Sequence, residues 1–292
     1  MAGTDEKPGT AVDGAIEYLR PRLAVTPVVA IVLGSGLGRI ADRCSGSRAI
    51  PYADIPGFPP CSVDGHEGKL SVGDWGGVPV AILQGRAHRY EGHSLEVVTR
   101  PIRALALLGV RTLITTCAAG SVGKSVPGDL LLIEDHLNMM GDNPLLGMAD
   151  SLSGSSRFVE MADAYDPWLR RTAQEAAAET GIALSQGVLA CVPGPSYETA
   201  AEAEMLGRLG AHAVTMSIVP EVIVARALKL RVMGLAVLTN RAGVRLDSRV
   251  GHQAVVARAE GMAQAIGFLL SGVLRRLKAA SLSDGGGETP SA

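Results

Sequence analysis

The feature that most constrains the fold of this 292-residue chain is its alternation of short apolar runs with amphipathic segments. The runs VVAIVL (28–33) and RVMGLAVLT (231–239) are apolar at nearly every position rather than at every second one, and TLITT (112–116) is predicted to be another buried strand. Continuous apolar strands are typical of sheets buried on both faces. The pattern therefore predicts an α/β protein with a mostly parallel or mixed sheet covered by helices.

The remaining segments extend this alternation along the chain. Further strands are predicted at 129–138, 187–192 and 213–216, with two more around a Gly-Gly turn in 69–85. Helices are predicted at 94–108, 168–180, 199–209, 220–228 and 252–277. There is no internal repeat or linker, so we predict one domain over residues 13–278. Residues 1–12 are expected to form a flexible arm and residues 279–292 a flexible tail.

Composition limits the classes of partner. The formal net charge is −2, so the charge favours neither nucleic acid nor an anionic membrane. Aromatic residues make up 3% of the chain, which argues against a platform for single-stranded bases. The four scattered cysteines form no C-x-x-C motif and indicate reduced thiols. No apolar run approaches the roughly 20 residues of a membrane span, and the polar start resembles no signal peptide, so we expect a cytoplasmic protein.

The first predicted strand leads into Gly34-Ser35-Gly36-Leu37-Gly38, a glycine-rich loop of the kind that holds phosphate. A dinucleotide loop needs glycine at the sixth place, where this chain has Arg39. A loop that binds nucleoside triphosphates is excluded as well, because no Gly-Lys-Ser/Thr follows. Backbone N–H groups and one hydroxyl are enough for a single anion, with an ordinary tight turn as the equal alternative.

A second strand end carries cationic donors. Arg86 and His88 are two residues apart, so they share a face of an extended segment. A guanidinium fork and an imidazole are suited to phosphate. Glu91 would orient His88 or hold it cationic. The alternative is a solvated polar loop.

Other strand ends carry polar groups whose individual signals are weak. The Cys117–Ser121 segment has small residues that let a ligand approach the backbone. Glu198 and Ser217 each precede a predicted helix, where the plain alternative is a helix cap. Asn240 ends the last strand and His252 begins the last helix. Because ligands of α/β sheets bind at the carboxyl ends of strands, these loops are expected to form one site.

Together these segments resemble one known family, the trimeric purine nucleoside phosphorylases that act on 6-oxopurine nucleosides. The matching motifs occur in family order and span residues 33–252: LGSGLG, IPGFP, GHEGKL, GRAHRYEGH, AAGS, DHLN, NPLLG, MADAYDP, GPSYET, MSIVPEVIVAR and TN. The resemblance implies the nucleoside phosphorylase α/β fold, with a mixed, partly barrel-like central sheet flanked by helices in a single domain.

The resemblance also implies a role for each matching residue. Phosphate would be held by six residues, with the backbone acting at Ala118 and His66 lying at the edge: Ser35, His66, Arg86, His88, Ala118 and Ser217. The ribose would meet Tyr90, Met216 and His252, together with Phe158 from a neighbouring subunit of a homotrimer. The base would stack on Tyr197, while Glu198 and Asn240 read its edge.

The implied reaction is phosphate-dependent cleavage of the N-glycosidic bond of inosine, guanosine and their 2′-deoxy forms in purine salvage. It needs phosphate on one face of a cationic sugar and help for the departing base on the other. His88, Glu198 and Asn240 are the expected catalytic residues. Inorganic phosphate would be a co-substrate, with no cofactor, no metal and no nucleic acid or membrane partner. No acid follows Asn240 before Asp247, which favours 6-oxopurines over the 6-amino group of methylthioadenosine.

Two positions depart from the family pattern. Cys117 stands where the family usually has asparagine, so an amide is lost beside the phosphate and base pockets, and Ile218 stands where threonine is common. Three alternatives therefore stay open. They are a methylthioadenosine phosphorylase-like enzyme, a ligand-binding protein without turnover, which only Cys117 favours, and, more distantly, a nicotinamide dehydrogenase.

Overall fold

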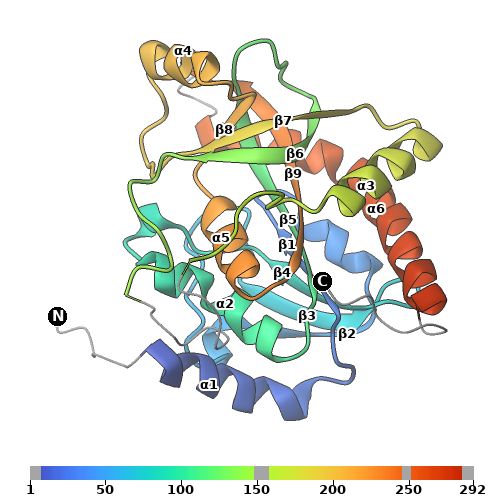
Figure 1. Cartoon of the computed structure of the whole chain (residues 1–292). Coiled ribbons are helices and arrows are strands. Elements are labelled where there is room, and N and C mark those ends of the chain that lie inside the picture. The colour runs from blue at the N-terminus through green and yellow to red at the C-terminus, as the bar shows by residue number, and fades with distance from the viewer. Residues whose placement is uncertain (1–7, 148–157, 245–250, 285–292) are drawn as a thin grey trace.

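The fold is organised by one mixed sheet of nine strands (Figure 1). The computed structural model describes residues 8–147, 158–244 and 251–284. Its strands, in chain order, are β1 Val29–Leu33, β2 Ser45–Pro51, β3 Lys69–Asp74, β4 Pro79–Gln84, β5 Thr112–Ser121, β6 Leu130–Asn138, β7 Leu184–Cys191, β8 Ala213–Thr215 and β9 Arg231–Arg241. Within the sheet they follow the order β2-β3-β4-β1-β5-β8-β7-β6-β9.

Five of these strands close into a ring. Strand β9, last in the order, also pairs in parallel with β5 along nearly its whole length, so β5, β8, β7, β6 and β9 form a barrel. Strand β5 also pairs in parallel with β1, which links the barrel to the open part of the sheet. The predicted mixed, partly barrel-like sheet in a single domain is confirmed.

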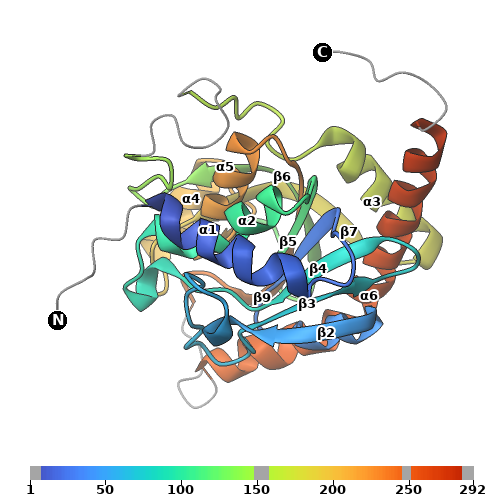
Figure 2. The same ribbon diagram turned by 90° about the horizontal axis from the view of Figure 1, so that it is seen from below.

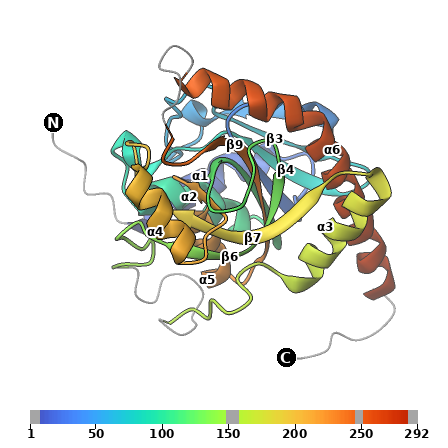
Figure 3. The same ribbon diagram turned by 90° about the horizontal axis from the view of Figure 1, so that it is seen from above.

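Helices cover the sheet on two sides (Figures 2 and 3). Helices α1 (Pro8–Leu19), α2 (Leu95–Leu107) and α5 (Val219–Ala227) share one hydrophobic core with the sheet. Helices α3 (Pro167–Thr180) and α6 (Gly251–Asp284) share a second core, and α4 (Ala200–Arg208) packs at the far end of the barrel. Within the described ranges, none of the helices combines the length and apolar character of a membrane span.

Local signals set several helix starts. The Ser94 hydroxyl accepts the backbone N–H of Val97 at the start of α2. Thr199 and Glu202 cap α4 reciprocally, with the Thr199 hydroxyl bonded to the Glu202 N–H and the Glu202 carboxylate to the Thr199 N–H. This capping box satisfies backbone donors that a helix start leaves unpaired. The predicted helices all form, and most of their bounds lie within two residues of those expected.

The structure differs from the prediction at both ends of the domain. Helix α1 begins at Pro8, so the last part of the predicted arm is helical, and Ala11 and Val12 are buried against the core. Helix α6 continues to Asp284, past the predicted start of the tail. The apolar residues at positions 11, 12, 15 and 19 form one short buried face of α1. This face is enough to hold the helix in place because it packs against α2. The remaining arm and tail residues, 1–7 and 285–292, lie outside the described residues.

Strand β2 was not predicted. Its residues are exposed except for Ile50, because β2 is the edge strand and pairs only with β3. An edge strand of polar residues carries little apolar periodicity, so it has the appearance of a loop in the sequence.

Candidate active site

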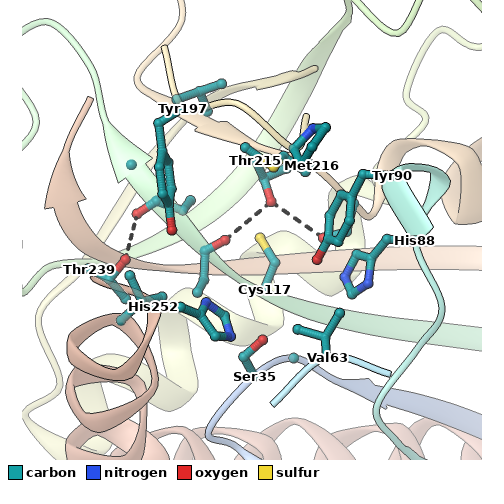
Figure 4. A pocket seen from close by; sticks show the side chains of 18 of the residues that line it. Ser35, Val63, His88, Tyr90, Cys117, Tyr197, Thr215, Met216, Thr239 and His252 are labelled. Atoms are coloured by element: carbon teal, nitrogen blue, oxygen red, sulfur yellow. Dashed lines mark hydrogen bonds between the residues drawn. The ribbon is translucent and has the colours of Figure 1, made fainter. Parts of the chain in front are cut away.

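A cavity of about 270 Å³ opens where β1, β4, β5, β8 and β9 end. All but one of the predicted site residues line it, so the structure brings together groups that are up to 217 residues apart (Figure 4). The lining set comprises Ser35, His66, Arg86, His88, Tyr90, Ala118, Tyr197, Glu198, Met216, Ser217, Asn240 and His252. In Figure 4, Ser35 and His88 lie on one side of the cavity and Tyr197 lies on the other.

The glycine-rich loop brings Ser35 to the cavity. A Cβ on Gly34 would lie 2.9 Å from both the Cα of Cys117 and the carbonyl oxygen of Thr116, so only glycine lets the loop lie against β5. The backbone N–H of Gly34 donates to the Thr116 hydroxyl at 3.0 Å. The loop is thus fixed to the strand that carries Ala118.

His66 orients Ser35. The Nδ1 atom of His66 accepts the backbone N–H of Arg86 at 2.8 Å, so its single hydrogen is carried on Nε2. Nε2 lies 2.8 Å from the Ser35 hydroxyl oxygen and donates to it. Burial, followed by the neighbouring charges of His88 and Arg86, lowers the pKa of His66 to about 2, consistent with a neutral ring. The Ser35 hydroxyl hydrogen therefore stays available to a ligand.

His88 is oriented by Glu91. The Glu91 carboxylate accepts the His88 backbone N–H at 2.7 Å and lies 2.9 Å from Nδ1. Burial acts to raise the pKa of Glu91, but hydrogen bonds from His88 and Ser62 lower it to about 2. Burial lowers the pKa of His88 despite this carboxylate. Of the two roles considered for Glu91, orientation is thus favoured over holding a cation.

The guanidinium of Arg86 was expected to offer two parallel hydrogen bonds to an anion, but it is bonded within the protein instead. Its Nε donates to Glu221 Oε1 at 2.6 Å and its Nη2 to Glu221 Oε2 at 3.2 Å. Both residues are buried, with 6% of Arg86 and 3% of Glu221 exposed. Burial alone would lower the pKa of Arg86, but the Glu221 carboxylate raises it above its ordinary value. Sequence reasoning missed Glu221, because a glutamate in the first turn of a helix is usually explained by the helix dipole.

Ser217 reaches the cavity from a strained turn. The backbone N–H of Val219 donates to the Ser217 carbonyl at 2.8 Å, and Ile218 between them has φ 68° and ψ −60°. A positive φ is costly for a β-branched residue and is found where the surroundings enforce it. The alternative that Ser217 caps α5 is wrong, since Ile218 holds the N-cap position and no side chain caps it.

Cys117 lies on β5 with its sulfur directed into the cavity between Thr215 and Ser35 (Figure 4). Burial raises the pKa of its thiol to about 11. The Thr215 hydroxyl lies near Ser217 and donates to the Ala118 carbonyl at 3.2 Å. Sequence reasoning did not identify Thr215, because a single hydroxyl near a strand end carries no distinct pattern.

The opposite side of the cavity carries a carboxylate and an amide. Glu198 does not cap α4, since Thr199 does, which leaves its carboxylate for the cavity. Burial raises the pKa of Glu198. Asn240 Oδ1 accepts the Thr239 hydroxyl at 2.9 Å and Nδ2 reaches the Arg241 carbonyl at 3.5 Å, so the amide is oriented and the second Nδ2 hydrogen is left for a ligand. Thr239 is a further lining residue that the sequence did not reveal.

The remaining predicted residues divide into two groups. Tyr90 stacks on His88 with ring centroids 4.7 Å apart. His252, at the start of α6, has its Nε2 atom 3.1 Å from the backbone carbonyl of Asp64. Phe158 does not line the cavity of its own chain and is 86% exposed. It directly follows residues 148–157, which lie outside the described ranges.

The cavity has hydrogen-bond donors suited to an anion on one side, and a carboxylate and an amide on the other. It lies beside a barrel closed by five strands, and these features agree with a match to one known superfamily. A family model, the phosphorylase superfamily, matches residues 28–275, a span that holds every strand. The chain is 44% identical over 252 residues to purine nucleoside phosphorylase 1 of Geobacillus stearothermophilus, covering 86% of this chain and 92% of that protein. It is 41% identical over 275 residues to purine nucleoside phosphorylase of Rattus norvegicus, covering 90% and 95%.

A solved structure agrees with this match. The schistosoma purine nucleoside phosphorylase in complex with hypoxanthine superposes with a TM-score of 0.80 at 34% identity, covering 91% of this chain and 96% of that one. The chain belongs to the purine nucleoside phosphorylases, which are enzymes of the glycosyltransferase class.

Proposed function

We propose that the enzyme cleaves inosine, guanosine and their 2′-deoxy forms with inorganic phosphate, releasing the free base and ribose or deoxyribose 1-phosphate. The observation that carries this proposal is the division of the cavity. Ser35, His66, Arg86 and His88 lie together at the side of the glycine-rich loop, and Ala118 and Ser217 line the same cavity from β5 and from the turn after β8. Glu198 comes from the loop after β7 and Asn240 from near the end of β9. A sugar bound between them would meet phosphate on one face and the leaving base on the other.

The phosphate side acts by position and charge. The free hydroxyl hydrogen of Ser35, the backbone at Ala118 and the hydroxyl of Ser217 would hold the anion, with His88 against it. The bound anion stabilises the positive charge that develops on the sugar as the glycosidic bond breaks. One of its oxygens then bonds to the anomeric carbon as the base departs. Tyr90, Met216 and His252 would hold the ribose.

The base side stabilises the leaving group and selects it. Asn240 Nδ2, whose orientation Thr239 fixes, would donate to purine N7 as negative charge grows there. Glu198 would accept the N1–H of a 6-oxopurine, and Tyr197, half-exposed at the mouth, would stack on the ring. A 6-aminopurine has no N1–H, so it would leave Glu198 without its partner.

Three wider statements belong to the same proposal. The enzyme works as a homotrimer in which the exposed Phe158 of one subunit completes the ribose site of the next. It uses no metal or organic cofactor, because phosphate and Asn240 handle the charges that the reaction develops. It acts in the cytoplasm in purine salvage, in keeping with the four free cysteines among the described residues.

A substrate panel with and without phosphate, reading the free base released, tests the proposal. We expect inosine and guanosine to be consumed only with phosphate, and adenosine and methylthioadenosine at least about a hundredfold more slowly. Equal or better activity on methylthioadenosine would overturn the specificity. Binding of inosine without turnover would instead support a ligand-binding protein, the alternative that Cys117 left open.

A further inference from the structure

The hydrogen-bond donors of Arg86 are almost all used within the protein. A guanidinium carries five N–H hydrogens. Besides the two that meet Glu221, Nη2 donates to the Thr115 hydroxyl at 2.8 Å and Nη1 donates to the Thr116 carbonyl at 2.7 Å. Among the described residues, only the second hydrogen of Nη1 has no recorded protein partner. Arg86 can therefore give the cavity one hydrogen bond, not a two-point fork.

Glu221 and Thr115 enforce this arrangement. The Thr115 hydroxyl donates to Glu221 Oε2 at 2.6 Å while accepting from Arg86, so the three side chains form a closed buried cluster. The cluster joins the loop after β4, strand β5 and helix α5. Because Glu221 is 3% exposed and lies directly against the guanidinium, it also offsets the positive charge of Arg86.

We propose that Glu221 is a positioning residue that restricts Arg86 to one hydrogen bond with phosphate and withholds most of its charge from that anion. This inference rests on the proposed function and deepens it. A bidentate ion pair binds a phosphate more tightly in the ground state and draws off its negative charge. That charge is what stabilises the sugar cation in the transition state, so tighter binding of this kind lowers turnover.

The test compares Glu221→Gln with the wild type. The variant keeps the shape of the side chain but removes the charge that offsets Arg86. We expect phosphate affinity, measured by calorimetry, to increase by about threefold or more, because the ion pair with phosphate gains strength. We expect kcat for inosine to fall by about tenfold or more, because that added contact is made in the ground state.

A matched control is Glu96→Gln. Glu96 binds Arg100 on α2 with the same two-point geometry, Nε and Nη2 each at 3.0 Å, away from the cavity. That variant is expected to leave both quantities unchanged. Weaker or unchanged phosphate affinity in folded Glu221→Gln, or an unchanged kcat, would overturn the proposal, as would the same changes in Glu96→Gln.

Thr115→Val decides the matter if Glu221→Gln does not fold. It frees one Nη2 hydrogen of Arg86 and removes the hydroxyl that donates to Glu221 Oε2, while the Arg86–Glu221 ion pair stays in place. We expect the same changes, smaller in size, in a protein that still folds but melts at a lower temperature because a buried hydroxyl is lost, and the opposite sign would count against the proposal. Calorimetry needs no turnover, so a wild type that binds phosphate without cleaving nucleosides would refute the proposed function while the affinities still decide the role of Glu221.

Discussion

The imidazole of His66 donates to the Ser35 hydroxyl across 2.8 Å, and its tautomer is set by the backbone N–H of Arg86. The hydroxyl that faces the anion side is therefore oriented by a residue 31 positions away, held in turn by the strand-end segment that carries Arg86. Gly85 makes this contact possible, because a Cβ there would lie 2.7 Å from the Cβ of His66.

The first prediction is that His66 acts on phosphate through Ser35. Ser35→Ala and His66→Gln should each weaken phosphate binding, and the double variant should be little worse than Ser35→Ala alone, because contacting residues are not additive. Titration calorimetry of all four proteins measures the coupling. Additive losses would show that His66 contacts the anion independently.

The second prediction concerns acid stability. The folded pKa of His66 is about 2, below its ordinary 6.5, so the unfolded chain takes up this proton first as the pH falls. The contribution of His66 to stability is complete above pH 6.5 and is lost progressively as the pH falls from there towards 2. Urea unfolding from pH 7.5 to 4 should show a shrinking difference between wild type and His66→Gln. Histidines that do not interact with His66 cancel in this difference, and a constant difference would contradict the assignment.

The third prediction concerns the leaving group. Asn240→Ala should raise the barrier for inosine cleavage by about 2–4 kcal/mol, the usual loss for a donor that acts in the transition state. Thr239→Val should also lower kcat, by a smaller factor, because the side-chain amide of Asn240 can then rotate. Both are read as kcat at saturating phosphate. An unchanged kcat in Asn240→Ala would refute the role of the amide.

The fourth prediction concerns base recognition. Glu198→Ala should abolish most activity on inosine, because the N1–H of the base loses its acceptor. Since burial raises the pKa of Glu198, wild-type activity should begin to fall with acid at a higher pH than an ordinary glutamate would give. Glu204→Gln, on the exposed side of α4, is the control. Normal inosine turnover by Glu198→Ala would rule out the proposed contact.

The fifth prediction concerns assembly. If Phe158 completes a neighbouring site, Phe158→Ala should raise KM for inosine and leave KM for phosphate unchanged. Leu146→Ala removes another apolar side chain that is largely exposed and should change neither constant. Dilution of the wild type until sedimentation shows monomers should weaken nucleoside binding in the same way. Full binding affinity in the monomer would exclude a shared site.

More of the cavity-lining residues than of the residues that position them could be predicted from the sequence. Arg86, His88 and Asn240 were predicted because polar residues directly after apolar strands have one explanation in an α/β sheet. Glu91 was found too, since it lies three residues from His88. Glu221 and Thr115 were not, because they meet Arg86 across 135 and 29 positions and sit where helix and strand geometry already account for them.

Phe158 marks another limit of sequence reasoning. The sequence assigned it to a site, but its own chain places it outside the cavity, and only assembly can test that assignment. The edge strand β2 was missed for a simpler reason, since a strand exposed at nearly every position leaves no apolar pattern.

Strand β5 belongs to both the open sheet and the barrel, with neighbours on each side, and it carries Ala118 at the anion side of the cavity. Asn240 lies near the end of β9 and pairs with Gly120 of β5, whereas Glu198 lies in the loop between β7 and α4. Ala118 and Asn240 are thus part of the barrel itself, whereas Glu198 is carried by a loop at its margin. Changes in that loop can therefore alter what Glu198 contacts without disturbing the barrel strands that hold Ala118 and Asn240.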